Sequence, residues 1–150
     1  MLKPILLALA LLAPGIAAAQ QAQSPGPTLS AVRARGALSC GISTGDPAWS
    51  APDSRGEWQG MDADVCRAIA AATLGDPKKL VWQHLTGQNR FPAVVTGQVE
   101  VLTRTTTWTF MRDATLGLNF TAPNFFDGQG FLVRADSGIT AARQLDGATI

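Results

Sequence analysis

The stretch VEVLTRTTTWTFMR, residues 99–112, joins a short apolar strand to a hydroxyl-rich turn and then to a helix that carries one arginine. Apolar residues come first and hydroxyl groups follow, with the latter supplied by Thr105, Thr106, Thr107 and Thr109. Backbone N–H groups at a helix start, threonine hydroxyls and the Arg112 guanidinium can converge on one carboxylate. The junction therefore predicts an anion site, although a threonine-rich turn that caps an ordinary helix explains these residues equally well.

Strands and helices alternate on the N-terminal side of this junction. Strands are predicted at residues 37–42, 80–85 and 99–103, with helices at 29–35 and 62–74 and a short one that contains Pro92. We expect Asp62 to cap the second helix and Thr109 to cap the arginine helix. This order predicts an α/β fold with a parallel sheet and with ligand contacts at the carboxyl ends of its strands.

A long turn-rich segment, residues 43–60, separates the first strand from the second helix. It contains Gly45, Pro47, Pro52 and Gly56 together with two tryptophans. Loops of this length in compact domains usually have a function. Because the loop follows a strand at its carboxyl end, it is a candidate for ligand binding together with the hydroxyl-rich turn of residues 105–109, called the threonine turn below.

The first nineteen residues have the pattern of a cleavable export signal. Lys3 supplies a positive charge, residues 5–12 are apolar, and three alanines precede Gln20, so cleavage is predicted near Ala19. Residues 20–27 are polar and rich in proline and predict a disordered leader. The apolar run is too short to cross a bilayer. We therefore expect a periplasmic monomer without stable membrane insertion after the signal is removed.

Charge and chemistry exclude several classes of function. The chain has 12 basic and 11 acidic residues, and removal of Lys3 with the signal leaves equal numbers, so nucleic acid is not an expected partner. The single histidine, His84, cannot form a metal site alone and lies in a strand-like run. No catalytic set of Ser, His and Asp or of Cys and His is visible. We expect no metal, no cofactor and no enzyme.

Two cysteines, Cys40 and Cys66, lie on the first strand and on the helix that follows it. An even count in an oxidising compartment favours a disulfide, and these two elements pack face to face in a βαβ unit. Two buried free thiols remain the alternative.

The C-terminal part of the sequence has weaker patterns. Residues 128–133 form a glycine-containing extended run in which the chain could cross between lobes, and residues 141–145 predict a helical turn. Residues 148–150 have the composition of a starting strand. Because a strand of this length cannot pair, we expect the sequence to be the amino-terminal portion of a longer protein.

Three segments in this order resemble the periplasmic amino-acid-binding proteins of ABC importers, the general L-amino-acid-binding group within bacterial extracellular solute-binding protein family 3. They are LSCGISTGDPAWSAPDSRGEWQGMDADVCRAIAAATLGD, GQNRFPAVVTGQVEVLTRTTTWTFMRD and LGLNFTAPNFFDGQGFLV. The resemblance implies the type II two-lobed periplasmic-binding-protein fold. Residues 28–127 would form most of the first lobe, and residues 128–150 the outward crossover strand and the start of an incomplete second lobe.

The resemblance also implies roles for individual residues. Arg112 matches the arginine that binds the ligand α-carboxylate, and Thr107 and Thr105 match hydroxyl or amide donors. Asp46 and Gly87 stand where many members carry aromatic rings that sandwich the ligand side chain. Trp49 and Trp108 lie nearby and line the pocket in one interpretation; in the others they serve core packing or form an exposed lid.

Arg104 is a further candidate, either for the ligand or for the lobe surface. The family's ammonium-binding aspartate belongs to the second lobe and has no counterpart in these 150 residues. The implied function is a non-catalytic receptor that captures a free L-amino acid and presents it to an inner-membrane ABC permease. A cyclohexadienyl (arogenate or prephenate) dehydratase on the same fold and a truncated product without function are the alternatives.

Overall fold

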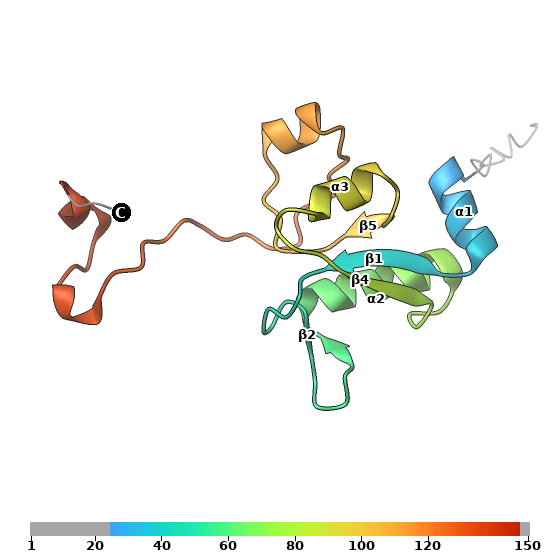
Figure 1. Cartoon of the computed structure of the whole chain (residues 1–150), viewed down its shortest axis with the longest axis horizontal. Helices are drawn as coiled ribbons and strands as arrows, with labels where there is room; N and C mark the ends of the chain where they lie inside the picture. The colour runs from blue at the N-terminus through green and yellow to red at the C-terminus, as the bar shows by residue number, and fades with distance from the viewer. Residues whose placement is uncertain (1–24, 148–150) are drawn as a thin grey trace, which may run out of the picture.

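The computed structural model describes residues 25–147, so the predicted signal, most of the leader and the strand expected at 148–150 lie outside the described residues. Helices and strands alternate over the first two thirds of this part, as the sequence predicts (Figure 1). In chain order the elements are α1 (Pro27–Arg35), β1 (Leu38–Ile42), β2 (Ala51–Pro52), β3 (Trp58–Gln59), α2 (Met61–Leu74), β4 (Leu80–His84), α3 (Arg90–Val95) and β5 (Val101–Leu102). They are followed by η1 (Met111–Thr115), η2 (Ala135–Ser137) and η3 (Ala142–Leu145).

The central element is β1, whose five residues are all buried. It pairs in parallel with β4 on one side and β5 on the other, and Cys40 lies opposite both Trp82 and Val101. The predicted parallel α/β sheet is therefore confirmed. Strand β5 is shorter than the predicted 99–103, but hydrogen bonding continues beyond it, since the Thr103 N–H donates to the Gly41 carbonyl at 2.9 Å. The carboxyl ends of all three strands consequently lie along one edge of the sheet.

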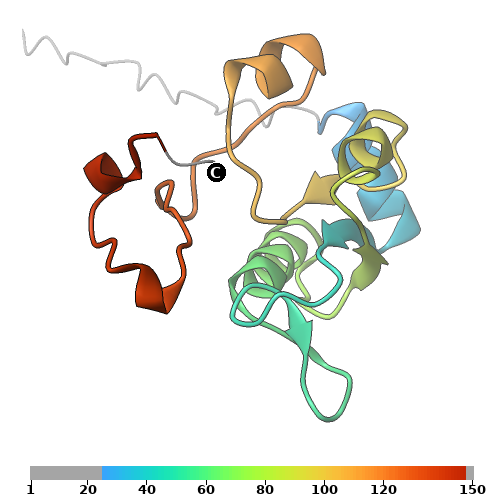
Figure 2. The same cartoon turned by 60° about the vertical axis from the view of Figure 1, so that its left-hand side comes forward.

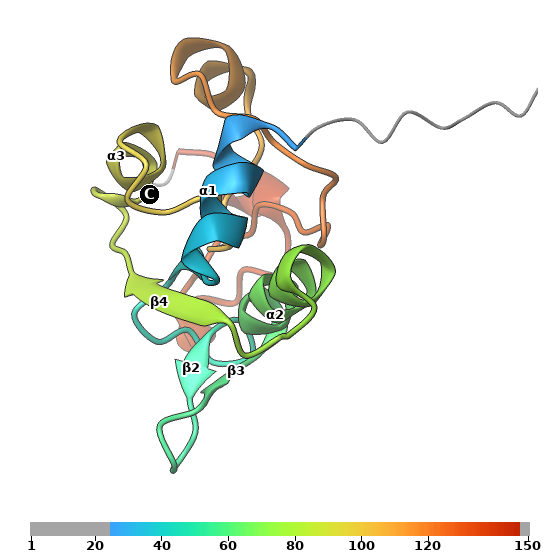
Figure 3. The ribbon, with the colours of Figure 1, turned by 90° about the vertical axis from the view of Figure 1, so that its right-hand side faces the viewer.

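Helix α2 packs along β1 and β4 (Figure 3) and begins differently from the prediction. The N-cap is Gly60, and Asp62 lies inside the first turn without a capping hydrogen bond, so the assignment of Asp62 as the cap is wrong. The N–H groups of Met61 and Asp62 instead donate to the carbonyls of Ala48 and Trp49 at 3.0 and 2.8 Å. Backbone from the preceding loop thus satisfies the helix start, and the Asp62 side chain is not used for it.

Residues 43–60, expected to be a loop, contain a small hairpin. Strands β2 and β3 pair in antiparallel fashion, with Ala51 opposite Gln59. The loop between the first strand and α2 is also fixed at its base, where the Ser43 and Ser50 hydroxyls are buried and 2.8 Å apart. The segment is therefore an ordered connection that holds Trp49 near the strand ends.

The disulfide between Cys40 and Cys66 is present and joins β1 to α2 across a Cα–Cα distance of 6.2 Å. Both residues are fully buried and pack with Ile42 in one core cluster, against which Trp58 and Trp82 also pack. The bridge, predicted from the sequence, ties the central strand to the helix that carries Asp62.

Replacement of both cysteines by serine should lower the free energy of unfolding by about 3 kcal/mol, because the 26-residue separation closes a loop of substantial entropy. Urea unfolding of oxidised and double-variant protein measures the difference. Dithiothreitol should lower the stability of the native protein to a similar extent and leave the double variant unchanged. Equal unfolding midpoints for the two proteins would contradict the stabilising role.

After η1 the chain first returns to the edge of the sheet, where Phe125 meets Trp49, and then runs away from it (Figures 1 and 2). Residues 121–132 are all exposed, and no strand is assigned in residues 128–133, where the sequence predicts a crossover strand. Figure 1 draws this run as a drawn-out chain without a helix, and the expected helical turn follows as η3. Over residues 25–147, no helix combines the length and the apolar character that crossing a bilayer requires.

Candidate ligand-binding site

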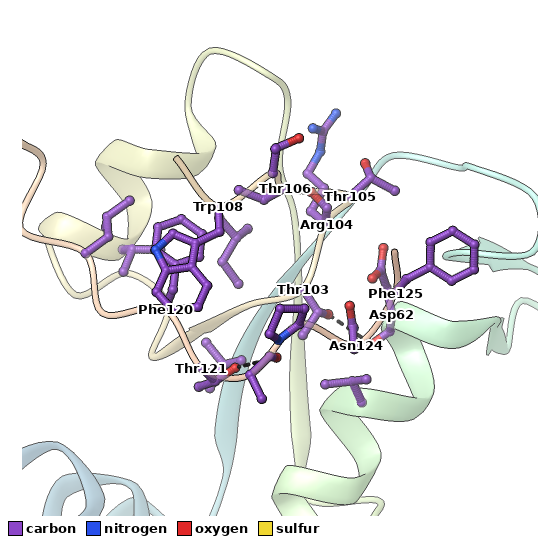
Figure 4. Close-up of a pocket in the computed structure, with 18 of the residues that line it drawn as sticks. Asp62, Thr103, Arg104, Thr105, Thr106, Trp108, Phe120, Thr121, Asn124 and Phe125 are labelled. Atoms are coloured by element: carbon purple, nitrogen blue, oxygen red, sulfur yellow. Dashed lines mark hydrogen bonds between the residues drawn. The ribbon is translucent and has the colours of Figure 1, made fainter. Parts of the chain in front are cut away.

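A cavity of about 540 Å³ opens at the carboxyl ends of the parallel strands. Its walls come from β5 and the threonine turn, from the first turns of α2, and from residues 118–127 (Figure 4). Apolar and aromatic side chains such as Val65, Leu102 and Phe120 share these walls with hydroxyl and charged groups. A mostly apolar hollow with a few fixed polar groups is the usual form of a small-molecule site.

The threonine turn is held in place by hydrogen bonds of the two residues that precede it, Thr103 and Arg104. Thr103 is buried, and its hydroxyl donates to the Asp62 carbonyl at 2.9 Å, which connects the end of β5 to α2. Arg104 donates from Nε to the Leu85 carbonyl at 2.9 Å. Thr105 has a φ of 28°, a left-handed backbone conformation that is uncommon outside glycine. The turn is thus a defined backbone structure on the cavity wall.

Four of the six predicted ligand contacts line this cavity, namely Thr105, Thr107, Trp49 and Trp108. Arg112 and Asp46 are not among the lining residues. The N–H of Asp46 donates to the Ser50 carbonyl at 2.9 Å, so the backbone of Asp46 belongs to the base of the loop formed by residues 43–60. Arg104, for which the sequence left two roles open, lies on the cavity wall.

Arg112 lies immediately next to the threonine turn. Its Nη1 donates to the Thr107 carbonyl at 2.6 Å, and its guanidinium is 5.3 Å from the centre of the Phe91 ring. The Arg112 N–H donates to Thr109 Oγ1 at 3.3 Å, which gives Thr109 the capping bond expected of it, although the assigned N-cap of η1 is Phe110. Arg112 therefore does not line the cavity itself, but it is hydrogen-bonded to Thr107, which does.

The two candidate tryptophans form aromatic pairs with the segment that follows η1. Trp49 meets Phe125 edge to face at 4.8 Å, and Trp108 stacks on Phe120 at 5.7 Å between ring centroids. Trp108 also donates from Nε1 to Asp113 at 3.1 Å. Both rings thus form cavity wall and packing contact at once, so the pocket and packing interpretations of these residues are compatible.

Sequence reasoning missed Asp62 as a member of the site. Its side chain lines the cavity, the residue is buried, and Oδ2 has no hydrogen-bond partner among the described residues. Burial raises the pKa of the Asp62 carboxyl, while the Thr105 backbone N–H and the Arg104 charge oppose that rise. The sequence signal that could have identified Asp62 was an acidic residue just after the loop of residues 43–60. An acidic residue at that place is equally typical of a helix cap.

A parallel α/β lobe with a cavity at its strand ends, lined by a hydroxyl-rich turn, defines a small-molecule-binding protein. The sequence matches the family model of the bacterial extracellular solute-binding proteins, family 3, over residues 38–146. The chain belongs to this family. The fold is that of the type II periplasmic binding proteins.

Relatives and a solved structure agree with this membership. The chain is 52% identical over 123 residues to the glutamate/glutamine/aspartate/asparagine-binding protein BztA of Rhodobacter capsulatus, covering 82% of this chain and 36% of BztA. It is 45% identical to the general L-amino acid-binding periplasmic protein AapJ of Rhizobium johnstonii, with the same two coverages. An ABC transporter periplasmic binding protein from Brucella ovis, solved with glutathione bound, has a TM-score of 0.74 at 48% identity and is covered to 37%, against 79% of this chain. The chain therefore spans less than two fifths of the length of these proteins.

Proposed function

We propose that this chain belongs to a periplasmic receptor that captures free L-amino acids for an ABC importer. The observation that carries the proposal is the threonine turn on the cavity wall, with Thr105 and Thr107 lining the cavity and Arg112 bonded to Thr107. The names of BztA and AapJ, both amino-acid-binding proteins, support the same ligand class.

The proposed contact is a carboxylate grip. The guanidinium has five N–H donors, and the only hydrogen bond it donates among the described residues is that from Nη1 to Thr107. Its other donors can meet a carboxylate placed against the turn, together with the hydroxyl groups of Thr105 and Thr107. A planar guanidinium binds both carboxylate oxygens, which a lysine ammonium cannot reproduce.

Capture in this proposal requires a second lobe that closes over the other end of the ligand. Ligand stabilises the closed state because only that state contacts it from both sides, so closure is a shift in population. The closed receptor would then be recognised by the inner-membrane permease. We propose that the protein works as a monomer in the periplasm and uses no cofactor.

Isothermal titration of the complete gene product with single L-amino acids tests the proposal. At least one common amino acid should bind with a dissociation constant on the order of micromolar, as expected for a ligand held by several charge-assisted hydrogen bonds. The D-enantiomer of the same amino acid is the matched control and should bind far more weakly. Absence of binding across all twenty would contradict the receptor function.

We also propose that the protein is not an enzyme, since the relatives at 45–52% identity are named as binding proteins. Incubation with arogenate or prephenate should leave both compounds unchanged beyond their spontaneous decay. Their conversion to phenylalanine or phenylpyruvate at an accelerated rate would instead support the dehydratase alternative.

A further inference from the structure

We propose that Thr103 is a positioning residue of the ligand site, whose hydroxyl group couples the Cys40–Cys66 disulfide to the threonine turn. Ligand affinity would then depend on the disulfide through this hydroxyl group. The inference deepens the proposed function and rests on it. It is carried by a buried hydroxyl group that contacts the disulfide and belongs to a residue of the cavity wall.

The Thr103 hydroxyl lies where three parts of the fold meet. Its oxygen is 3.1 Å from Cys66 Sγ and 3.9 Å from Cys40 Sγ. Its hydrogen is donated to the Asp62 carbonyl at 2.9 Å, in the first turn of α2. The Thr103 backbone N–H donates at 2.9 Å to the carbonyl of Gly41, which follows Cys40 on β1. The residue thus connects β1, α2 and the end of β5.

The connection from Thr103 to the threonine turn is short and stiff. Only Arg104 separates Thr103 from Thr105, and Figure 4 shows Thr103 beside the start of α2 and below these two residues. The peptide units between them are planar, so a displacement of Thr103 moves the start of the turn with it. The turn also meets α2 directly, because the Thr105 backbone N–H opposes the rise that burial causes in the pKa of the Asp62 carboxyl. A shift of α2 would therefore change the position of the Thr105 hydroxyl.

Loss of the disulfide would disturb this arrangement, because the core around it is closed. Cys40 and Cys66 are 0% exposed and Thr103 is 8% exposed. A dithiol reductant supplies two electrons and two protons, so that the S–S bond breaks, two thiols form and the dithiol becomes a disulfide. Unbonded sulfur atoms lie further apart than bonded ones, and a close-packed interior provides that room only if neighbouring groups move. The Thr103 hydroxyl, in contact with Cys66, is one of these neighbours.

Thr103→Val in the complete gene product tests the assignment, since valine keeps the branched shape and removes the hydroxyl group. Its affinity for the preferred L-amino acid, measured by isothermal titration, should fall about five- to tenfold, at the lower end of usual couplings between sites. Thr103→Ser keeps the hydroxyl group and should bind nearly as the wild type does. Thr73→Val is the matched control, because the Thr73 hydroxyl also donates to a carbonyl of α2, that of Ile69 at 2.7 Å, but Thr73 is not among the lining residues. Its affinity should stay at the wild-type value.

A double-mutant cycle with the alanine pair Cys40→Ala and Cys66→Ala tests the dependence on the disulfide. The pair should lower the affinity about as much as Thr103→Val does, and Thr103→Val added to the pair should lower it no further, because both changes break the same contact. Titrations run at a temperature at which thermal unfolding shows each variant to be folded, so lower stability alone leaves the affinity unchanged. If the triple variant does not fold, dithiothreitol added to the wild type and to Thr103→Val gives the same comparison, with a thiol count to confirm reduction.

Three results would overturn this inference and leave the receptor function intact, since the wild type still binds. Losses that multiply in the cycle would show that the disulfide and Thr103 act separately. Wild-type affinity in Thr103→Val would refute the positioning role. A Thr103→Ser protein as weak as Thr103→Val would assign the effect to packing of the methyl group. Absence of binding of the wild type to every amino acid would instead overturn the receptor function, and this inference with it.

Discussion

Arg112→Ala should lower the affinity for an L-amino acid at least about a hundredfold, because the proposed carboxylate grip would lose two charge-assisted hydrogen bonds at roughly 1.5–3 kcal/mol each. The loss should be similar for all amino acids, since the α-carboxylate is common to them. Isothermal titration of the variant against the preferred ligand gives the measurement.

Two further variants separate the effect of the planar guanidinium donors on affinity from the effect of positive charge alone. Arg112→Lys keeps the positive charge and loses the planar donor pair, so it should recover only a small part of the affinity. Arg143→Ala removes an exposed arginine of η3, far along the chain from the turn, and should bind as the wild type does. Near-normal affinity in Arg112→Ala would refute the carboxylate assignment.

Arg112 is also a structural residue, and this effect has to be measured separately. Its bond to the Thr107 carbonyl and its position over the Phe91 ring hold η1 against α3. Both contacts are partly exposed to solvent, so their loss should cost about 1 kcal/mol of stability at most. A variant that unfolds near the wild-type temperature but does not bind would therefore report on the ligand.

The elements that the sequence predicted are those with local signals. Gly36 and Gly75 end α1 and α2 with φ values of 73°, as a left-handed C-cap requires. The buried face of α2 is formed by Ala63, Cys66 and Ala70. The alternation of strands with helices was sufficient for the parallel sheet. The hairpin of β2 and β3 was not predictable, because strands of two residues have no periodicity that a sequence can show.

The candidate site was predicted only in part, for a similar reason. Thr105 and Thr107 follow a strand directly, so their place at the sheet edge follows from the order of the elements. Asp62 was taken as a helix cap because its residue type fits that role, and what decides otherwise is a contact made at long range. The carbonyls of Ala48 and Trp49 accept hydrogen bonds from the first N–H groups of α2, and no sequence pattern within α2 predicts these bonds.

Gly60→Ala should destabilise the protein by about 4 kcal/mol, which makes it the most damaging single substitution that we expect outside the core. Gly60 has φ 109° and ψ 173°, a conformation that is essentially restricted to glycine and costs other residues about 1–3 kcal/mol. A Cβ atom there would lie 2.6 Å from the Trp49 carbonyl oxygen and 2.7 Å from that of Ala48. Both atoms are backbone and cannot move aside, so overpacking adds about 1–3 kcal/mol.

Gly56→Ala is the matched control, because Gly56 lies in the same loop with φ 81° but has open space around it. It should cost only about 1 kcal/mol, the strain of a left-handed alanine. Urea unfolding of both variants, followed by tryptophan fluorescence, gives the comparison, and equal stabilities would contradict the close approach at Gly60. Any Gly60→Ala protein that remains folded must separate the Trp49 carbonyl from the start of α2. Since that carbonyl binds the Asp62 N–H, ligand affinity should fall with stability in Gly60→Ala and stay unchanged in Gly56→Ala.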